Sequence, residues 1–314
     1  MDILIWFVIF IISLFVLSKA ADFFNNAAEA IGVSWGIPKF TIGILLVAVG
    51  TSLPELISSI ISMRNGLTEV VFGNVTGSNI TNIFFIMGVA SIIYRKEIKL
   101  ELLLIKIDLQ FLMASSLFII ITCYDGIFTI YEGLFLLAAY FIYLVYLVGN
   151  ITSRVELNAG EIEGKRGIIK YYILFPISIF LLFISGHWAI KSVIQLSANL
   201  NIGAAIIASS AIAIGTSLPE LFVTITAFKK NKPEMAVGNI LGSCIFNSLS
   251  VMGLSSLFGT ITITPEVLHT CLLFMLLATV LFFIIARDRN LNKWEGYLLI
   301  LFYILFVGKL FAVF

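Results

Sequence analysis

The hexapeptide Gly-Thr-Ser-Leu-Pro-Glu occurs twice in this chain of 314 residues, at Gly50–Glu55 and again at Gly215–Glu220. Each copy lies inside a long apolar segment and ends in a carboxylate. An acidic side chain is costly to place in the hydrocarbon of a membrane, and where one occurs it usually marks a functional site. Two copies therefore predict a single site that is built from two halves of the chain.

The composition places the chain among integral membrane proteins. Hydrophobic residues make up 60% of it and charged residues only 12%, whereas a soluble domain has about 25% charged residues. The first apolar stretch, Ile3–Leu17, has no basic residues before it, so we expect a retained membrane helix rather than a signal peptide. We expect the three cysteines to be small buried side chains and not metal ligands: Cys123, Cys244 and Cys271.

Ten segments are close to the roughly 20 apolar residues that a spanning helix needs. These predicted helices cover residues 3–22, 40–63, 70–94, 101–122, 127–149, 169–190, 203–228, 234–258, 266–286 and 295–313. One hydrophilic stretch separates the fifth helix from the sixth. We therefore expect an all-α integral membrane protein with a first five-helix repeat in 1–149, a linker in 150–167 and a second five-helix repeat in 168–314.

The two halves resemble each other in sequence. Residues 43–92 align with residues 208–257 without a gap, and 19 of the 50 positions are identical. Many of these identities are Gly, Ser, Asn, Pro and Glu, which the compositional bias of a membrane protein does not supply. Because five helices per half is an odd number, the second half must enter the membrane from the opposite side. The sequence thus predicts two inverted repeats.

Charge in the loops predicts the orientation. Of the 19 Lys and Arg residues, 14 fall on one side of the predicted topology, whereas the opposite loops hold Arg64 alone. Cytoplasmic loops are enriched in Lys and Arg, so the basic side is expected to be cytoplasmic. This assignment predicts a multi-pass protein of the plasma membrane with both termini outside and the linker at 150–167 in the cytoplasm.

Each motif copy contains a proline, Pro54 or Pro219, which lacks an N–H and should break the helix. A break frees carbonyl groups, and in hydrocarbon a bound cation can satisfy them. A second repeated block, Gly73–Asn82 and Gly238–Asn247, places a Ser and an Asn four residues apart on one helix face that can meet the glutamates. The candidate ligands are Ala48, Thr51, Ser52, Glu55, Ser78 and Asn82, together with Ala213, Thr216, Ser217, Glu220, Ser243 and Asn247.

This inventory consists of oxygen ligands, which suit Na⁺ and Ca²⁺, whereas zinc and copper prefer imidazole or thiolate. Magnesium is less expected because it sheds water reluctantly. Two ionised glutamates are neutralised by one Ca²⁺, by two Na⁺ or by two H⁺. An empty site would hold two like charges in a low-dielectric region, so its movement between the membrane faces is disfavoured. A carrier that moves only when loaded is an obligate exchanger.

The two motif pairs resemble the alpha-repeats of the cation/calcium exchanger superfamily, particularly its prokaryotic-type sodium/calcium exchangers. The two motif-bearing regions cover 43–92 and 208–257, and the ten-helix pattern extends the resemblance to the whole chain. The resemblance implies that Glu55 and Glu220 are shared ligands of Ca²⁺ and Na⁺. It also implies that Thr51 and Thr216 contribute to the calcium site, that Asn82 and Asn247 complete the centre, and that Ala48, Ser52, Ser78, Ala213, Ser217 and Ser243 serve flanking sodium sites.

The resemblance further implies a secondary active antiporter that works by alternating access. The family typically exchanges three Na⁺ for one Ca²⁺, which is electrogenic. Several members carry Asp where this chain has Asn247, and potassium-coupled members need that charge, so we expect exchange without K⁺. The protein is not expected to be an enzyme or to need a cofactor. We expect Na⁺ and Ca²⁺ as substrates within a lipid bilayer, and neither nucleic acid nor an obligatory protein partner.

The sequence is also compatible with other functions. A proton/calcium exchanger is the nearest alternative, because two glutamates can equally carry protons, and the flanking serines and carbonyls favour Na⁺ only weakly. A cation channel fits poorly, because it needs an open pore and no exchange partner. A membrane hydrolase with paired carboxylates would need a nucleophile and a cleft that the sequence does not indicate. The glutamates and asparagines can also have purely structural roles, and hydroxyls in membrane helices often bond the i−4 carbonyl.

Overall fold

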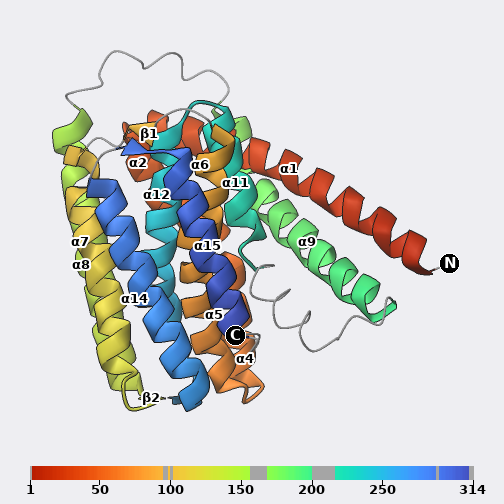
Figure 1. Cartoon of the computed structure of the whole chain (residues 1–314). Helices are drawn as coiled ribbons and strands as arrows, with labels where there is room; N and C mark the ends of the chain where they lie inside the picture. Colours follow the sequence, from red (N-terminus) through yellow and green to blue (C-terminus); the bar gives the residue numbers. More distant parts are fainter. Residues whose placement is uncertain are drawn as a thin grey trace.

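The computed structural model describes residues 2–94, 98–99, 102–155, 168–199, 216–287 and 290–310. These residues are helical apart from turns and four two-residue strands (Figure 1). In chain order the elements are α1 (Asp2–Ser34), α2 (Lys39–Ile42), η1 (Gly43–Val47), α3 (Ala48–Thr51), α4 (Leu53–Arg64), α5 (Thr68–Ile80), η2 (Thr81–Ile86), α6 (Met87–Tyr94), β1 (Ile98–Lys99), α7 (Leu102–Thr122), β2 (Ile127–Phe128), α8 (Ile130–Val155), α9 (Ile169–Asn199), α11 (Leu218–Lys229), α12 (Pro233–Ile245), η3 (Phe246–Val251), α13 (Met252–Ser256), β3 (Ile261–Thr262), α14 (Pro265–Arg287), β4 (Asn290–Leu291) and α15 (Lys293–Leu310). The three η segments are π-helical turns that continue the neighbouring α-helices.

Seven helical segments of the described chain are long and apolar enough to cross a membrane, which supports a multi-pass membrane protein. They are Ile3–Ser34, Lys39–Arg64, Thr68–Tyr94, Ile130–Gly149, Ile169–Ala189, Pro233–Ser256 and Val267–Ala286. A shorter apolar helix covers Ile107–Thr122. The helix α15 has 18 residues and carries charged residues near both ends.

Each of the ten predicted segments includes a helix in its described part, although several of the predicted boundaries differ from the observed ones. The first helix continues to Ser34 instead of ending near residue 22. Residues 127 and 128 form a strand, so α8 begins at Ile130 and not at residue 127. The first part of the predicted helix 203–228 and most of the predicted linker 150–167 lie outside the described residues.

The two motif segments with the second repeated block form the centre of the molecule. Every residue from Met235 to Ile245 on α12 is buried, and α5 is buried along most of its length. Glycines allow α12 to lie directly against η1: a Cβ on Gly43 would sit 2.5 Å from the Met235 carbonyl oxygen, and one on Gly242 would sit 2.7 Å from the Ala48 Cβ. Small residues at a helix contact let the backbones approach closely in a membrane protein.

The predicted helix break of the first half is present, and it falls on the serine of the motif rather than on the proline. In the second half a new helix likewise begins directly after the motif serine, whereas most of the segment before it lies outside the described residues. Ser52, with φ −89° and ψ 6°, separates α3 from α4, and Ser217, with φ −88° and ψ 5°, precedes α11. Pro54 and Pro219 then lie in the first turn of the new helix, where a missing N–H costs no hydrogen bond. Each half therefore has a new helix N-terminus inside the bundle.

The described elements of the two halves correspond closely. Helices α4 and α5 and the turn η2 match α11, α12 and η3 in length and in their spacing along the chain, in the same register as the sequence repeat. Strand β1 pairs antiparallel with β4, and β2 pairs antiparallel with β3, so each small sheet joins one half of the chain to the other. The two sheets lie at opposite ends of the bundle, with α4 near β2 and α11 near the end that carries β1 (Figure 1).

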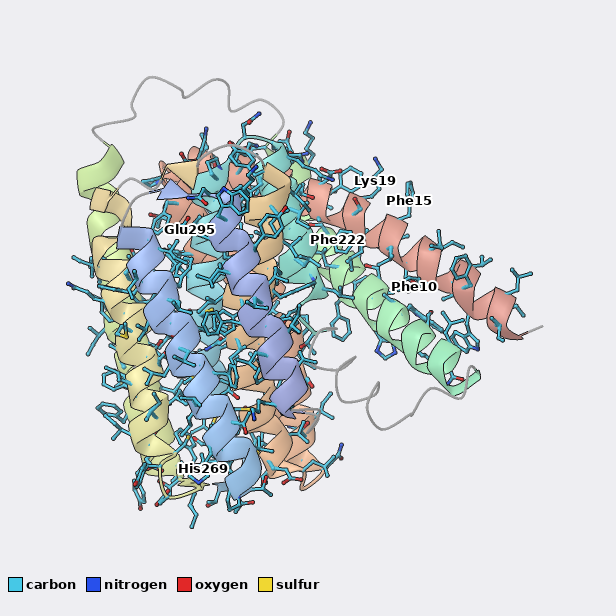
Figure 2. The ribbon with its side chains drawn as sticks, viewed as in Figure 1. Phe10, Phe15, Lys19, Phe222, His269 and Glu295 are labelled. Carbon is cyan, nitrogen blue, oxygen red and sulfur yellow. The ribbon has the colours of Figure 1, made fainter. Side chains whose placement is uncertain are left out.

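Helices α1 and α9 lie side by side and lean away from the remaining helices (Figure 1). We call this pair the two-helix arm. The rings of Phe24 and Phe175 stack with centroids 5.1 Å apart, and Trp35 Nε1 donates a hydrogen bond of 2.8 Å to the Tyr172 hydroxyl. Figure 2 shows Phe15 and Lys19 on the outer side of α1, where Phe15 is exposed as expected for a lipid-facing side chain.

Because α12 lies so close to the first half, adding a single methyl group to this contact should lower the stability of the fold markedly. A Cβ on Gly238 would collide with the Phe40 carbonyl oxygen and touch the Cα of Gly43. We expect Gly238→Ala to lower the free energy of unfolding by about 1–3 kcal/mol, because overpacking forces backbone shifts. Thermal unfolding of the purified protein in detergent measures this loss of stability. Gly149→Ala is the matched control, because no described atom lies within 4 Å of that Cβ; equal stability of the two variants would contradict the packing.

Candidate ion-binding site

Glu55 and Glu220 occupy equivalent positions in the first turns of α4 and α11. Both are completely buried. The N-terminal end of a helix carries partial positive charge, which favours a nearby carboxylate. The two carboxylates lie close enough for their charges to interact, so the structure brings together the two motif acids from opposite halves of the chain.

Hydroxyl groups from the opposite half lie beside each carboxylate. The Ser52 hydroxyl donates a hydrogen bond of 3.1 Å to Glu220 Oε1, and the Thr51 hydroxyl lies nearby. The Thr216 hydroxyl lies near the Glu55 carboxylate, as does the Ser78 hydroxyl of the same half. Within the described chain, both Glu55 oxygens and Glu220 Oε2 nevertheless have no hydrogen-bond partner. Each acid is thus incompletely satisfied by the protein.

Seven further buried side-chain atoms without a hydrogen-bond partner belong to other predicted ligands in the described chain. They are the hydroxyls of Ser78, Ser217 and Ser243 and both amide atoms of Asn82 and Asn247, and a smaller number of such atoms lie on residues outside the predicted set. Leaving a buried polar atom unsatisfied costs about 1–3 kcal/mol, so native proteins rarely tolerate a group of them without a ligand. The group combines carboxylate, amide and hydroxyl oxygens, which is the donor set that hard cations prefer.

The two asparagines owe their position to the π-helical turns. Asn82 lies in η2 and Asn247 in η3, and both are completely buried. A π-helical turn inserts an extra residue into the helix and re-aims the side chains around it, and it is frequent at functional sites. The sequence predicted that Ser78 and Asn82 share a face, but it gave no sign of the π turn.

Three predicted ligands are engaged in other contacts. The Ala48 carbonyl oxygen accepts hydrogen bonds from the Ser52 N–H at 3.0 Å and from the Thr51 hydroxyl at 3.2 Å. The Thr216 hydroxyl donates to Asn74 Oδ1 at 3.5 Å. An ion at Ala48 would have to share or replace these bonds. Ala213, the counterpart of Ala48, lies outside the described residues.

Asn74 and Asn239, which were not among the predicted ligands, hold the two halves together at this site. Asn74 Nδ2 donates to the Glu55 carbonyl oxygen at 3.1 Å and to Ser59 Oγ at 2.9 Å. Asn239 accepts a bond of 3.2 Å from the Thr51 hydroxyl, and its Nδ2 donates to Thr224 Oγ1 at 3.0 Å. The two asparagines are equivalent positions of the sequence repeat, and this identity was the available sequence signal for their roles.

No basic side chain of the described chain neutralises the two glutamates. The two ion pairs found in the described residues join α1 to the turn between α11 and α12. The same residues contain no group of three or more His, Cys, Asp or Glu side chains that would suit a transition metal. The negative charge of the pair is therefore left for a proton or a bound cation to balance.

Comparison with known proteins agrees with this chemistry. The profile described as "Sodium/calcium exchanger protein" matches residues 5–149 and 170–312, which is most of the chain. The chain belongs to the sodium/calcium exchanger family. The match covers both halves and omits a short central stretch that includes the predicted linker.

Several known proteins align with this chain over nearly its whole length. The sodium/calcium exchanger MaX1 of Methanosarcina acetivorans is 30% identical, over 98% of this chain and 99% of its own length. The inner membrane protein YrbG of Escherichia coli is 27% identical, over 91% of this chain and 90% of its own. A structure of the sodium-calcium exchanger NCX_Mj soaked with Na⁺ and Sr²⁺ superimposes with a TM-score of 0.83 at 26% identity, over 98% of both chains.

The hydrogen bonds of Asn74 predict a structural cost when its amide is removed. Asn74→Ala leaves the Glu55 carbonyl and the Ser59 hydroxyl without their donor, so we expect a loss of about 1–3 kcal/mol in the free energy of unfolding. Asn65→Ala in the exposed turn after α4 is the control and should change stability by less than about 0.5 kcal/mol. Denaturation followed by tryptophan fluorescence compares the two. Equal midpoints would show that Asn74 does not hold the motif.

Proposed function

We propose that this chain is a secondary active antiporter that exchanges Na⁺ for Ca²⁺. The observation that carries the proposal is the pair of buried glutamates, contributed by two broken helices and surrounded by buried oxygens without hydrogen-bond partners. Membership of the sodium/calcium exchanger family and the likeness to MaX1 and NCX_Mj, which are named as exchangers of these ions, support the same substrates.

In this proposal the two glutamates bind whichever cation is being carried. Glu55 and Glu220 supply the charge, Thr51 and Thr216 contribute to the calcium site, and Asn82 and Asn247 complete the centre. Flanking sodium sites use Ala48, Ser52, Ser78, Ala213, Ser217 and Ser243. Asn74 and Asn239 fix the broken helices relative to each other and hold the two carboxylates at the same depth.

The electrostatics of the empty site favour exchange over a channel or a uniporter. Without a cation, two carboxylates face each other in a buried region that has no basic partner among the described residues. A charged side chain at mid-membrane costs about 2.5–3.5 kcal/mol on insertion scales, and nearby like charges add to that cost. Moving the empty site between the two faces is therefore slow, and bound Na⁺ or Ca²⁺ makes the movement possible.

Alternating access is proposed to follow from two inverted repeats, residues 1–149 and 168–314, joined by the linker at 150–167. Three arrangements support the inversion. Equivalent elements α4 and α11 lie toward opposite ends of the bundle, the two small sheets lie at opposite ends, and the hydrogen bonds at Asn74 and Asn239 repeat across the halves (Figure 1). A symmetric site between such repeats can face either side of the membrane.

We place the protein in the plasma membrane with both termini outside and the linker in the cytoplasm. The excess of Lys and Arg on one side of the topology supports this orientation. The turn at Lys229, Lys230 and Lys232 lies on that basic side. The naming of the relative YrbG as an inner membrane protein agrees with a location in the cell membrane.

We further propose that the exchange is electrogenic and independent of K⁺. The centre holds two carboxylates and two amides, because Asn247 stands where potassium-coupled members need an acid. More than two Na⁺ ions per Ca²⁺ then move net charge across the membrane. Proton/calcium exchange is the second candidate, since the same two carboxylates can carry protons.

Neutralising either glutamate is expected to abolish Ca²⁺ transport. In Glu55→Gln or Glu220→Gln an amide replaces the carboxylate, so one charge of the dication is left uncompensated in a buried site. Uptake of radioactive Ca²⁺ into Na⁺-loaded proteoliposomes in Na⁺-free medium should fall at least 100-fold. Glu69→Gln, an exposed acid on α5, is the control and should keep the wild-type rate. Transport that survives either motif substitution would overturn the proposed site.

The coupling ion and the charge movement are tested in the same vesicles. A Na⁺ gradient without a pH gradient should drive Ca²⁺ uptake, and a pH gradient without Na⁺ should not. Because net positive charge leaves as Ca²⁺ enters, an inside-positive potential should accelerate uptake, and replacing choline by K⁺ on both sides should leave it unchanged. Uptake driven by the pH gradient alone favours the proton exchanger, and indifference to the potential contradicts electrogenic exchange.

A further inference from the structure

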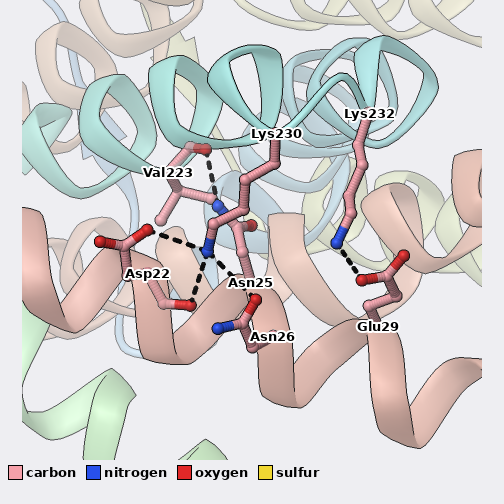
Figure 3. A network of polar contacts seen from close by, with 7 residues as sticks. All are labelled: Asp22, Asn25, Asn26, Glu29, Val223, Lys230 and Lys232. Atoms are coloured by element: carbon pink, nitrogen blue, oxygen red, sulfur yellow. Dashed lines mark hydrogen bonds and ion pairs between the residues drawn. The ribbon is translucent and has the colours of Figure 1, made fainter.

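Polar contacts fasten α1 of the two-helix arm to the turn between α11 and α12 (Figure 3). The Lys230 ammonium lies 2.9 Å from Asp22 Oδ1 and donates to the Asp22 carbonyl oxygen at 3.2 Å and to Asn26 Oδ1 at 3.1 Å. Lys232 forms an ion pair with Glu29. We call these five residues the clasp. The clasp joins α1, which is the arm helix of the first half, to a turn of the second half.

The clasp residues on α1 form a stripe along one face of the helix. Asp22, Asn26 and Glu29 are four and three residues apart, which places them on the side of α1 that faces the turn. Beneath them the buried Asn25 Nδ2 donates to the Val223 carbonyl oxygen of α11 at 2.9 Å. The second half of α1 is thus held to α11 by directed polar bonds, whereas the N-terminal part of α1 stands clear of the bundle (Figure 1).

The repeat-related end of the molecule cannot form this clasp. In the register of the sequence repeat, His187, Lys191 and Ile194 replace Asp22, Asn26 and Glu29, whereas Asn65 and Leu67 replace Lys230 and Lys232. No carboxylate and ammonium remain to pair. Instead, the Lys191 ammonium lies over the Trp188 ring of its own helix, 4.7 Å from the centroid. The clasp is therefore a one-sided addition to an otherwise repeated architecture.

We propose that the clasp is a latch that biases the arm toward its position against α11 at the lysine-rich end of the molecule. The proposal rests on the proposed exchange by alternating access, in which the site must open toward each end in turn. A contact made in one state alone shifts the equilibrium between states by its own free energy. The clasp consequently makes opening at the lysine-rich end rarer than opening at the opposite end.

The partial exposure of the clasp suits a contact that must break and re-form. The Lys230 and Asp22 side chains are 26% and 38% exposed. When the pair separates, water reaches both charges, so neither is left buried and unpaired as it would be in a core. Exposed ion pairs are individually weak, which limits the bias to about two- to tenfold and keeps both states accessible.

The position of the arm is measured without any transport. Nitroxide labels on Phe15→Cys of α1 and Leu301→Cys of α15 report the distance between the arm and the bundle, because both positions are exposed and the three native cysteines are buried. Adding Lys230→Gln and Lys232→Gln should increase the population of a second distance about two- to tenfold. Lys229→Gln, which removes one positive charge from an exposed neighbour outside the clasp, is the control and should leave the distribution unchanged.

Swapping the charges of one ion pair distinguishes the effect of a latch from the effect of a general loss of stability. Glu29→Lys and Lys232→Glu should each shift the distance distribution, and the double variant, which restores opposite charges, should return it toward that of the parent. In vesicles, breaking the clasp should lower the half-saturating Ca²⁺ at the lysine-rich face and raise it at the other face. Distributions identical to that of Lys229→Gln, or no recovery in the double variant, overturn the latch. Failure of wild-type exchange would instead overturn the proposed function, since the distance measurement does not depend on it.

Discussion

Two buried carboxylates that no basic group of the described chain neutralises are the constraint on which the rest of this structure depends. Glu55 and Glu220 are completely buried, and the ion pairs found in the described residues lie elsewhere. Their burial is tolerable because each lies in the first turn of a helix that begins inside the bundle, where the helix dipole favours negative charge. The helix dipole offsets only part of the cost, which leaves the remainder to a proton or a bound cation, and the oxygens around the two acids have no hydrogen-bond partner in the described chain.

Bringing two acids from distant segments to one buried site requires precise contact between the halves. The glycines of α12 let its backbone touch η1, and a side chain at either face of this contact would separate the helices. The Thr51 hydroxyl bonds to Asn239, and the Thr216 hydroxyl bonds to Asn74, so each broken helix is tied to the intact helix of the other half. The same close packing that brings the acids together also prevents them from relaxing apart.

Much of this architecture was predictable because the repeat keeps polar residues such as Asn and Glu at matching positions of otherwise apolar segments. Pro54 and Pro219 predicted the breaks. The structure confirms the first at the nearby Ser52, and it shows a helix that begins directly after Ser217. The roles of the site residues stay predictions, although the structure gathers most of those it describes around the two acids. The π-helical turns could not be predicted, because they arise from tertiary packing around Asn82 and Asn247 and have no periodicity of their own. The extension of α1 to Ser34 was missed because its polar stripe resembles a loop in the sequence; in the fold the stripe pairs with the lysines of the turn between α11 and α12.

The distribution of symmetry in the molecule follows from what an exchanger has to do. In the proposed site an ion meets the same oxygens from either side, which accounts for the match between the two halves at the glutamates, the serines and the asparagines. A preference for one orientation cannot be built into that centre without weakening binding from one face. It can be added at the periphery, where Lys230 and Lys232 meet α1 in partial contact with water and a change of charge costs little. Under the two proposals, repeated residues at the core serve ion binding, and unmatched residues at one end of the molecule control access to the site.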